Sequence, residues 1–155
     1  VFNAGQNGRS IPRNRWEVEP LLQTIRRQEP EITTVMLGTN DLLQSSSISA
    51  ADCAERMERF LNSLLEQKLS CQFLLIAPPP VALGAWVDDP RIVETSRRLG
   101  AHYQATAQKL GISFADAKDW NVELAYDGVH FSESGHRAFS DGIDNSLLGL
   151  AGGAS

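Results

Sequence analysis

The chain alternates between two kinds of segment from its first residues almost to its last. Short apolar runs, typical of buried strands, are separated by longer stretches in which apolar residues recur at helical spacing. The expected strands are residues 1–4, 32–37, 73–77 and 112–115. One expected helix contains residues 18–25, one follows Ser49, one begins at Pro90 and ends at Gly111, and one follows Ser132. This alternation, without an internal repeat or linker, predicts an α/β fold in which helices cover both faces of a parallel sheet.

The loops that follow the strands indicate where a functional site would lie. In an open parallel sheet, the loops at the carboxyl ends of the strands meet at one edge and form the binding crevice. Here these loops are residues 5–10, 38–47, 78–89 and 116–131. We therefore expect the four loops to converge on one site.

Size, charge and cysteine usage narrow the range of roles. The 155 residues are enough for one domain with a single core. The net charge of −5 comes from interspersed acids and bases, so nucleic acid is not an expected partner. The longest uncharged run, Leu69 to Val87, contains three successive prolines, which excludes a membrane span. Cys53 and Cys71 lack the spacing of a metal site and are expected to be free thiols.

The last long loop contains the sequence Asp127-Gly128-Val129-His130. This spacing can bring the carboxylate to one imidazole nitrogen and leave the other nitrogen free to take a proton, as in an oriented general base. A solvated turn explains the same residues equally simply. Asp116 and Asp119 are alternative acids, and His136 is a poorer alternative base because it lies further along the chain from Asp127.

Two earlier loops carry groups that can donate hydrogen bonds. Asn40 follows the strand 32–37, and an amide at a strand end can donate to an oxyanion. Gly8 closes the loop after residues 1–4, where a residue without Cβ lets a backbone N–H approach a substrate oxygen. An ordinary turn is the alternative for each loop, with Asn40 and Asp41 bonding their own backbone.

In this chain order, residues 3–8, 38–41 and 127–130 resemble the later sequence blocks of the SGNH, or GDSL-type, hydrolase family. The resemblance covers Val1 to about Leu148 as one domain, and residues 149–155 are expected to be a flexible tail. It implies a flavodoxin-like, three-layer α/β/α fold with strand order 2-1-3-4-5. It also implies an esterase that uses no metal and no cofactor.

The resemblance implies catalytic roles for four residues. His130 would act as the general base and then as the acid, and Asp127 would orient it. The Gly8 N–H and the Asn40 side chain would hold the oxyanion.

The resemblance also implies a set of substrate contacts. Thr39, Pro79 and Val129 lie in the stretches most similar to the arylesterases and acyltransferases of the family. Trp86 is expected beside them, because its loop also leaves the carboxyl end of a strand. The expected substrates are small esters with short acyl groups, while the oligomeric state, including a homo-oligomer, and the cellular location stay open.

The family's first block, Gly-Asp-Ser, does not occur in residues 1–155, and the serines that are present lie in other contexts. We therefore expect the nucleophile upstream of Val1, where any signal peptide would also lie, at the end of a strand that separates residues 1–4 from residues 32–37 in the sheet. The alternative is a non-catalytic module that binds an ester or a carbohydrate in the same crevice. A third option, a metal-assisted phosphoesterase, has too few ligands.

Overall fold

In the computed structural model, which describes residues 1–152, three parallel strands form the sheet. β2 (Gln72–Ala77) lies between β1 (Ile32–Val35) and β3 (Ser113–Asp116), so the spatial order follows the chain order. In the register of the first pair, Thr34 lies beside Leu74. This order is the one expected for the last three strands of a flavodoxin-like sheet.

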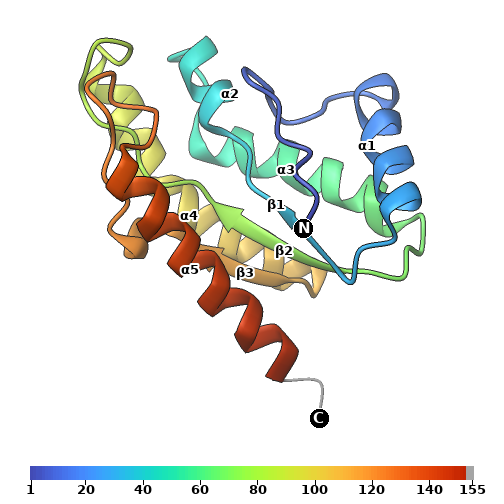
Figure 1. Ribbon diagram of the computed structural model, residues 1–155. Helices are drawn as coiled ribbons and strands as arrows, with labels where there is room; N and C mark the ends of the chain where they lie inside the picture. Colours follow the sequence, from blue (N-terminus) through green and yellow to red (C-terminus); the bar gives the residue numbers. More distant parts are fainter. Residues whose placement is uncertain (153–155) are drawn as a thin grey trace.

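Helices cover both faces of the sheet, as the alternation of segments predicts (Figure 1). α1 (Arg15–Gln28), α3 (Ala50–Leu65) and α4 (Pro90–Leu110) lie on one face. α5 (Glu133–Gly152) lies on the other, and a short 3₁₀ helix, η1 (Ala117–Trp120), follows β3. The result is a three-layer α/β/α arrangement.

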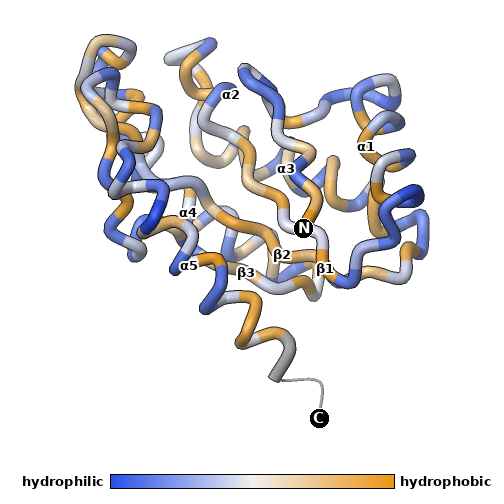
Figure 2. The backbone as a smooth tube through the Cα atoms, viewed as in Figure 1, coloured by the Kyte–Doolittle hydropathy of each residue, from blue (hydrophilic) through white to orange (hydrophobic). Residues whose placement is uncertain are grey.

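The side chains of β2 show how the strand serves both layers. Phe73, Leu75 and Ala77 belong to the large core cluster that the first three of these helices cover. Leu74 and Ile76 point the other way, into a second cluster that packs against α5. Figure 2 accordingly shows most of β2 in the hydrophobic colour and α1 as rich in hydrophilic residues.

Helix ends lie at the residues that the sequence indicates. α3 begins after Ser49, whose hydroxyl accepts from the Asp52 N–H while the Asp52 carboxylate accepts from the Ser49 N–H, which completes a capping box. α4 ends before Gly111, which adopts a left-handed conformation with φ of 65°. α5 follows Ser132, whose hydroxyl accepts a hydrogen bond of 3.1 Å from the Gly135 N–H.

Two expectations about the strands are wrong. Residues 1–4 form no strand, because no strand lies beside them among the described residues to accept their backbone hydrogen bonds. They do not pair with β1, so the strand expected between the two stays a prediction. β1 ends at Val35 and is not buried on both faces, because Thr34 on this outer strand of the described sheet is exposed.

Two segments expected to be irregular are helical. The expected loop 38–47 contains α2 (Thr39–Gln44), which buries Leu42 in the large core cluster. α5 continues through residues 149–152, where we expected the flexible tail to begin. The rest of that expected tail, residues 153–155, lies outside the described residues.

Both cysteines are free thiols, as predicted. Cys53, on α3, is fully buried, and this burial, with a smaller contribution from the Asp41 carboxylate, raises the pKa of the thiol to about 12. Such a thiol carries almost no thiolate at neutral pH and is not a nucleophile. Cys71 is half-buried and accepts a hydrogen bond of 3.6 Å from the Thr33 hydroxyl.

Candidate active site

The side chains of Asp127 and His130 form a hydrogen-bonded pair on the loop before α5. Asp127 Oδ2 lies 2.8 Å from His130 Nδ1, and Asp127 Oδ1 accepts hydrogen bonds from the backbone N–H groups of Val129 and His130 at 2.8 and 2.9 Å. These backbone hydrogen bonds are the main reason that the pKa of Asp127 is lowered. Because an ionised carboxylate has no proton to donate, Nδ1 is the donor, and Nε2 of a neutral imidazole is left with a free lone pair.

Burial separates the two partners in a way that suits a base and its orienter. Asp127 is only 6% exposed, whereas the His130 side chain is 60% exposed. The carboxylate is therefore held inside the loop, while the free face of the imidazole is open to a reacting group.

Backbone hydrogen bonds join this loop to the loop that follows β2. The N–H groups of Ala82, Ala85 and Trp86 donate to the carbonyl groups of Gly128, Tyr126 and Asp127, at 2.9, 3.2 and 3.1 Å respectively. We call these three hydrogen bonds the loop clasp. They fix the segment 126–128, and with it the position of the imidazole, relative to the sheet.

Two glycines allow the loop clasp to form. A Cβ on Gly84 would lie 2.5 Å from the backbone carbonyl carbon of Asp127. A Cβ on Gly128, which has φ of 81°, would lie 2.1 Å from the carbonyl oxygen of Ala82. Any other residue at either position would push the two loops apart.

Trp86 lies directly beside the imidazole. The ring centroids of Trp86 and His130 are 4.8 Å apart and the ring planes are almost perpendicular, at 81°. The indole remains 62% exposed, so much of its surface can contact another molecule. Since the backbone N–H of Trp86 is also part of the loop clasp, the same loop presents the indole and supports the imidazole of His130.

The second group of predicted residues lies around the start of α2. Asn40 is the second residue of this helix, and its Nδ2 donates to the carbonyl oxygen of Arg9 at 3.0 Å. This contact brings Asn40 to the loop that contains Gly8, which has φ of 71°. The amide has a second N–H, which leaves one donor for a substrate oxygen.

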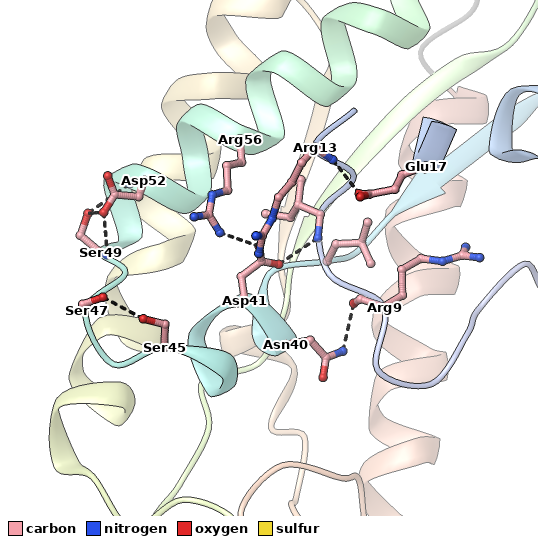
Figure 3. Close-up of polar contacts among 12 residues, drawn as sticks. Arg9, Arg13, Glu17, Asn40, Asp41, Ser45, Ser47, Ser49, Asp52 and Arg56 are labelled. Atoms are coloured by element: carbon pink, nitrogen blue, oxygen red, sulfur yellow. Dashed lines mark hydrogen bonds and ion pairs between the residues drawn. The ribbon is translucent and has the colours of Figure 1, made fainter. Parts of the chain in front are cut away.

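Asp41 organises this region, although the sequence alone identified it only as a turn residue. The side chain is completely buried. As Figure 3 shows, Asp41 lies among groups from two other segments: its Oδ2 accepts from the Ile11 N–H at 2.9 Å, and its Oδ1 lies 3.0 Å from Arg56 Nη1 and 3.7 Å from Arg13 Nη2. The only sequence signals for this arrangement were an acidic residue directly after Asn40 and arginines at distant positions in the chain.

The remaining predicted substrate contacts lie in different environments. Thr39 is the first residue of α2 and is half-buried. Val129 is also half-buried, and its backbone N–H donates a hydrogen bond to the Asp127 carboxylate. Pro79 is buried and lines a surface cavity of about 540 Å³ together with Tyr126 and Gly128. That cavity does not include His130 among its lining residues.

The alternative acids and bases are not part of the pair. Asp116 is bound to Lys118 at 3.0 Å, and no hydrogen bond joins it or Asp119 to His130 in the described part of the chain. His136 is exposed, and its ring contacts Phe131. Within residues 1–152, no three His, Cys, Asp or Glu side chains come together where a metal ion could bind.

The two groups of residues lie at the same end of the sheet. Figure 1 shows α2, the loop 82–87 and the loop 126–131 beyond the carboxyl ends of the strands, near the top of the view. Over residues 1–152, no hydrogen bond connects Asn40 or Gly8 with Asp127 or His130. None of the described helices is long and apolar enough to cross a membrane.

Comparisons with known proteins bear on the fold and on the family of this chain. The fold is similar to Est24, a carbohydrate acetylesterase from Sinorhizobium meliloti, with a TM-score of 0.78 and 21% identity over 92% of this chain and 75% of that chain. It is also similar to the M. smegmatis aryl esterase, with a TM-score of 0.76 and 20% identity over 97% and 78%. Axe2, an acetylxylan esterase from Geobacillus stearothermophilus, gives a TM-score of 0.68 and 17% identity over 90% and 68%.

At these identities the likeness shows the fold, which is the α/β fold of SGNH hydrolases. The chain spans about three quarters of the length of the first two structures. No curated protein matches the sequence. The sequence model of the GDSL-like Lipase/Acylhydrolase family, however, matches residues 1–138, which is most of the chain. This chain therefore belongs to the GDSL-like lipase/acylhydrolase family and is a carboxylic ester hydrolase.

Proposed function

We propose that this chain is the part of a serine esterase that supplies the base and the oxyanion donors for hydrolysis of short-chain carboxylic esters. The observation that carries the proposal is the Asp127–His130 pair, in which Nδ1 is engaged at 2.8 Å and Nε2 is free. The nucleophile would be a serine on a segment upstream of Val1. The catalytic domain would extend from there to about Leu148.

The chemistry follows from the groups that are free to react. The serine Oγ attacks the ester carbonyl carbon while its proton passes to His130 Nε2, and the Asn40 amide and the Gly8 N–H donate to the oxygen that becomes negative. The imidazolium, stabilised by Asp127, then protonates the departing alcohol and leaves an acyl-serine. Water attacks the acyl carbon, gives its proton to Nε2, and releases the acid and the free serine as that proton returns to Oγ.

Two observations favour a short acyl group. The exposed Trp86 indole stands beside the imidazole and would close one side of the site against a long chain. Two of the proteins with a similar fold are described as acetylesterases of carbohydrates or xylan, and a third as an aryl esterase. Thr39, Pro79 and Val129 would complete the contacts with the substrate.

Labelling of the natural full-length polypeptide with a serine-reactive fluorophosphonate separates an esterase from a non-catalytic ester- or carbohydrate-binding module. An esterase is expected to be labelled on a serine upstream of Val1, and to hydrolyse p-nitrophenyl acetate faster than the palmitate. The His130→Ala variant should lose the labelling, while the exposed His136→Ala variant should keep it. A wild-type protein that is neither labelled nor active would contradict the proposal and support the binding module. Faster hydrolysis of the palmitate would contradict the short-chain specificity alone.

A further inference from the structure

Asp41 is a charged side chain in a place where a charge is unfavourable unless it is compensated. It lies in the first turn of the short helix α2 and has no exposed surface. Removing a carboxylate from water is costly, and a buried carboxylate persists only when hydrogen bonds and opposite charges surround it. The partners of Asp41 therefore indicate what the charge does in the fold.

Those partners come from two segments distant in the sequence. The Ile11 N–H, in the segment before α1, donates to Oδ2 at 2.9 Å. Arg56, on α3, donates to Oδ1 at 3.0 Å, and its side chain is only 22% exposed. Arg13 adds a second positive charge at 3.7 Å. No other charged side chain pairs with Asp41 among the described residues.

Asn40 and Asp41 hold the same short stretch of chain through opposite kinds of group. The Asn40 amide donates to the carbonyl oxygen of Arg9, and the Asp41 carboxylate accepts from the N–H of Ile11 (Figure 3). Two contacts this close together fix both the distance and the orientation of the stretch relative to α2. Gly8 immediately precedes this stretch, so its N–H is placed by the same two contacts.

This matters because oxyanion donors act only when they are well placed. They must lie about 2.7–3.1 Å from the position that the oxyanion will occupy, and a misplacement of about 1 Å can lower the rate by roughly 100-fold. In this chain the two donors, Gly8 and Asn40, come from segments that are far apart in the sequence. A fixed bridge between those segments is therefore needed.

We propose that Asp41 is a positioning residue of the oxyanion site: its buried carboxylate, held by Arg56, locks the segment 9–11 to α2 and so aligns the Gly8 N–H with the Asn40 amide. This inference rests on the proposed esterase function. Asp41 itself touches neither the substrate nor the base.

The test is a double-mutant cycle in the natural full-length polypeptide, with p-nitrophenyl acetate as substrate. Asp41→Asn keeps the shape of the side chain and removes its charge, and should lower kcat by about 10- to 100-fold with little change in KM. Asn40→Ala should lower kcat by about 100-fold or more. Because both changes impair the same pair of donors, the double variant should lose much less than the product of the two single losses.

Arg59→Met is the matched control, since Arg59 also lies on α3 but is exposed and pairs with Glu55. It should leave kcat unchanged. In Asp41→Asn, the acidic limb of the pH profile of kcat/KM should also be unchanged, because the Asp127–His130 pair is intact. If Asp41→Asn does not fold, Arg56→Met replaces it, and a kcat at least about fivefold lower is expected because the carboxylate loses its anchor.

Three outcomes would overturn the inference: an unchanged kcat in Asp41→Asn or its replacement, losses that multiply in the double variant, or a shifted acidic limb. These outcomes are distinct from a failure of the proposed function. If the wild-type polypeptide has no esterase turnover, the function is wrong. If the wild type is active and Asp41→Asn has the same kcat, only the positioning role is wrong.

Discussion

Two parts of the proposed active site are built in opposite ways: the base loop, residues 126–131, and the oxyanion region around Gly8 and Asn40. In the base loop, Asp127 and His130 lie on one turn, and main-chain hydrogen bonds hold that turn to the neighbouring loop. In the oxyanion region, side chains join segments that are far apart in the sequence, through a buried charge. One half of the site is therefore encoded locally, whereas the other exists only after the tertiary fold has formed.

The largest effect should come from removing the base itself. In the natural full-length polypeptide, His130→Ala should lower kcat by about 10⁴-fold or more, because the Asp127 carboxylate, which remains on the base loop, is buried and its lowered pKa makes it a poor acceptor for the proton of the nucleophile. Steady-state kinetics with p-nitrophenyl acetate measures this loss. His136→Ala is the control, since His136 is exposed on α5. If His130→Ala kept more than a tenth of the wild-type kcat, His130 would not be the general base.

A smaller effect is expected from moving the base loop without changing its reactive groups. Gly84→Ala places a Cβ against the backbone of Asp127, so the loop clasp must open and the imidazole must shift relative to the oxyanion region. We expect kcat to fall by about tenfold or more, while the Nδ1 proton keeps its low-field NMR signal because the Asp127–His130 hydrogen bond lies within the loop.

Gly149→Ala is the matched control, because a Cβ at that position of α5 meets no neighbour within 4 Å. Loss of the low-field signal in Gly84→Ala would mean that the pair depends on the loop clasp and is not a local unit. A kcat within twofold of the wild type would mean that the loop clasp does not position the base.

The smallest effect concerns stability and tests whether the ionised carboxylate organises the base loop. The pKa of Asp127 is lowered in the folded protein from an unfolded value of about 3.9. A carboxyl whose pKa is lowered by folding stabilises the fold at pH values above its pKa in the unfolded chain. This contribution is lost as the pH falls through its pKa in the folded protein. The urea midpoint of the wild type should therefore exceed that of Asp127→Asn at pH 6, and the gap should narrow at pH 3. A gap of equal size at both pH values would show that the charge of Asp127 does not stabilise the loop.

The contact within the base loop could be predicted from the sequence because it depends on residues that are close together in the chain. Asp127 and His130 are close in the chain, so their spacing alone predicts their contact. The helix ends at Ser49 and Gly111 were predictable on the same grounds, since capping depends on residues within one turn. The alternation of segments likewise predicted the layers and the parallel sheet.

Features that depend on distant partners could not be predicted in this way. The role of Asp41 depends on Ile11 and Arg56, which no local pattern connects with it. The strand expected at residues 1–4 has the composition of a strand, but a strand also needs a neighbour, and composition does not supply one. The loop clasp was also missed, because hydrogen bonds between main-chain atoms leave no trace in side-chain identity except at Gly84 and Gly128.

The main-chain nature of the loop clasp has a consequence for how such an enzyme can evolve. Its hydrogen bonds use atoms that every residue except proline possesses, so substitutions at the exposed positions Leu83, Ala85 and Trp86 leave it intact. The proposed substrate wall beside the imidazole can therefore diversify by point mutation toward other acyl or alcohol groups while the imidazole keeps its place. Selection on specificity and selection on reactivity then act on separate positions of the same loop.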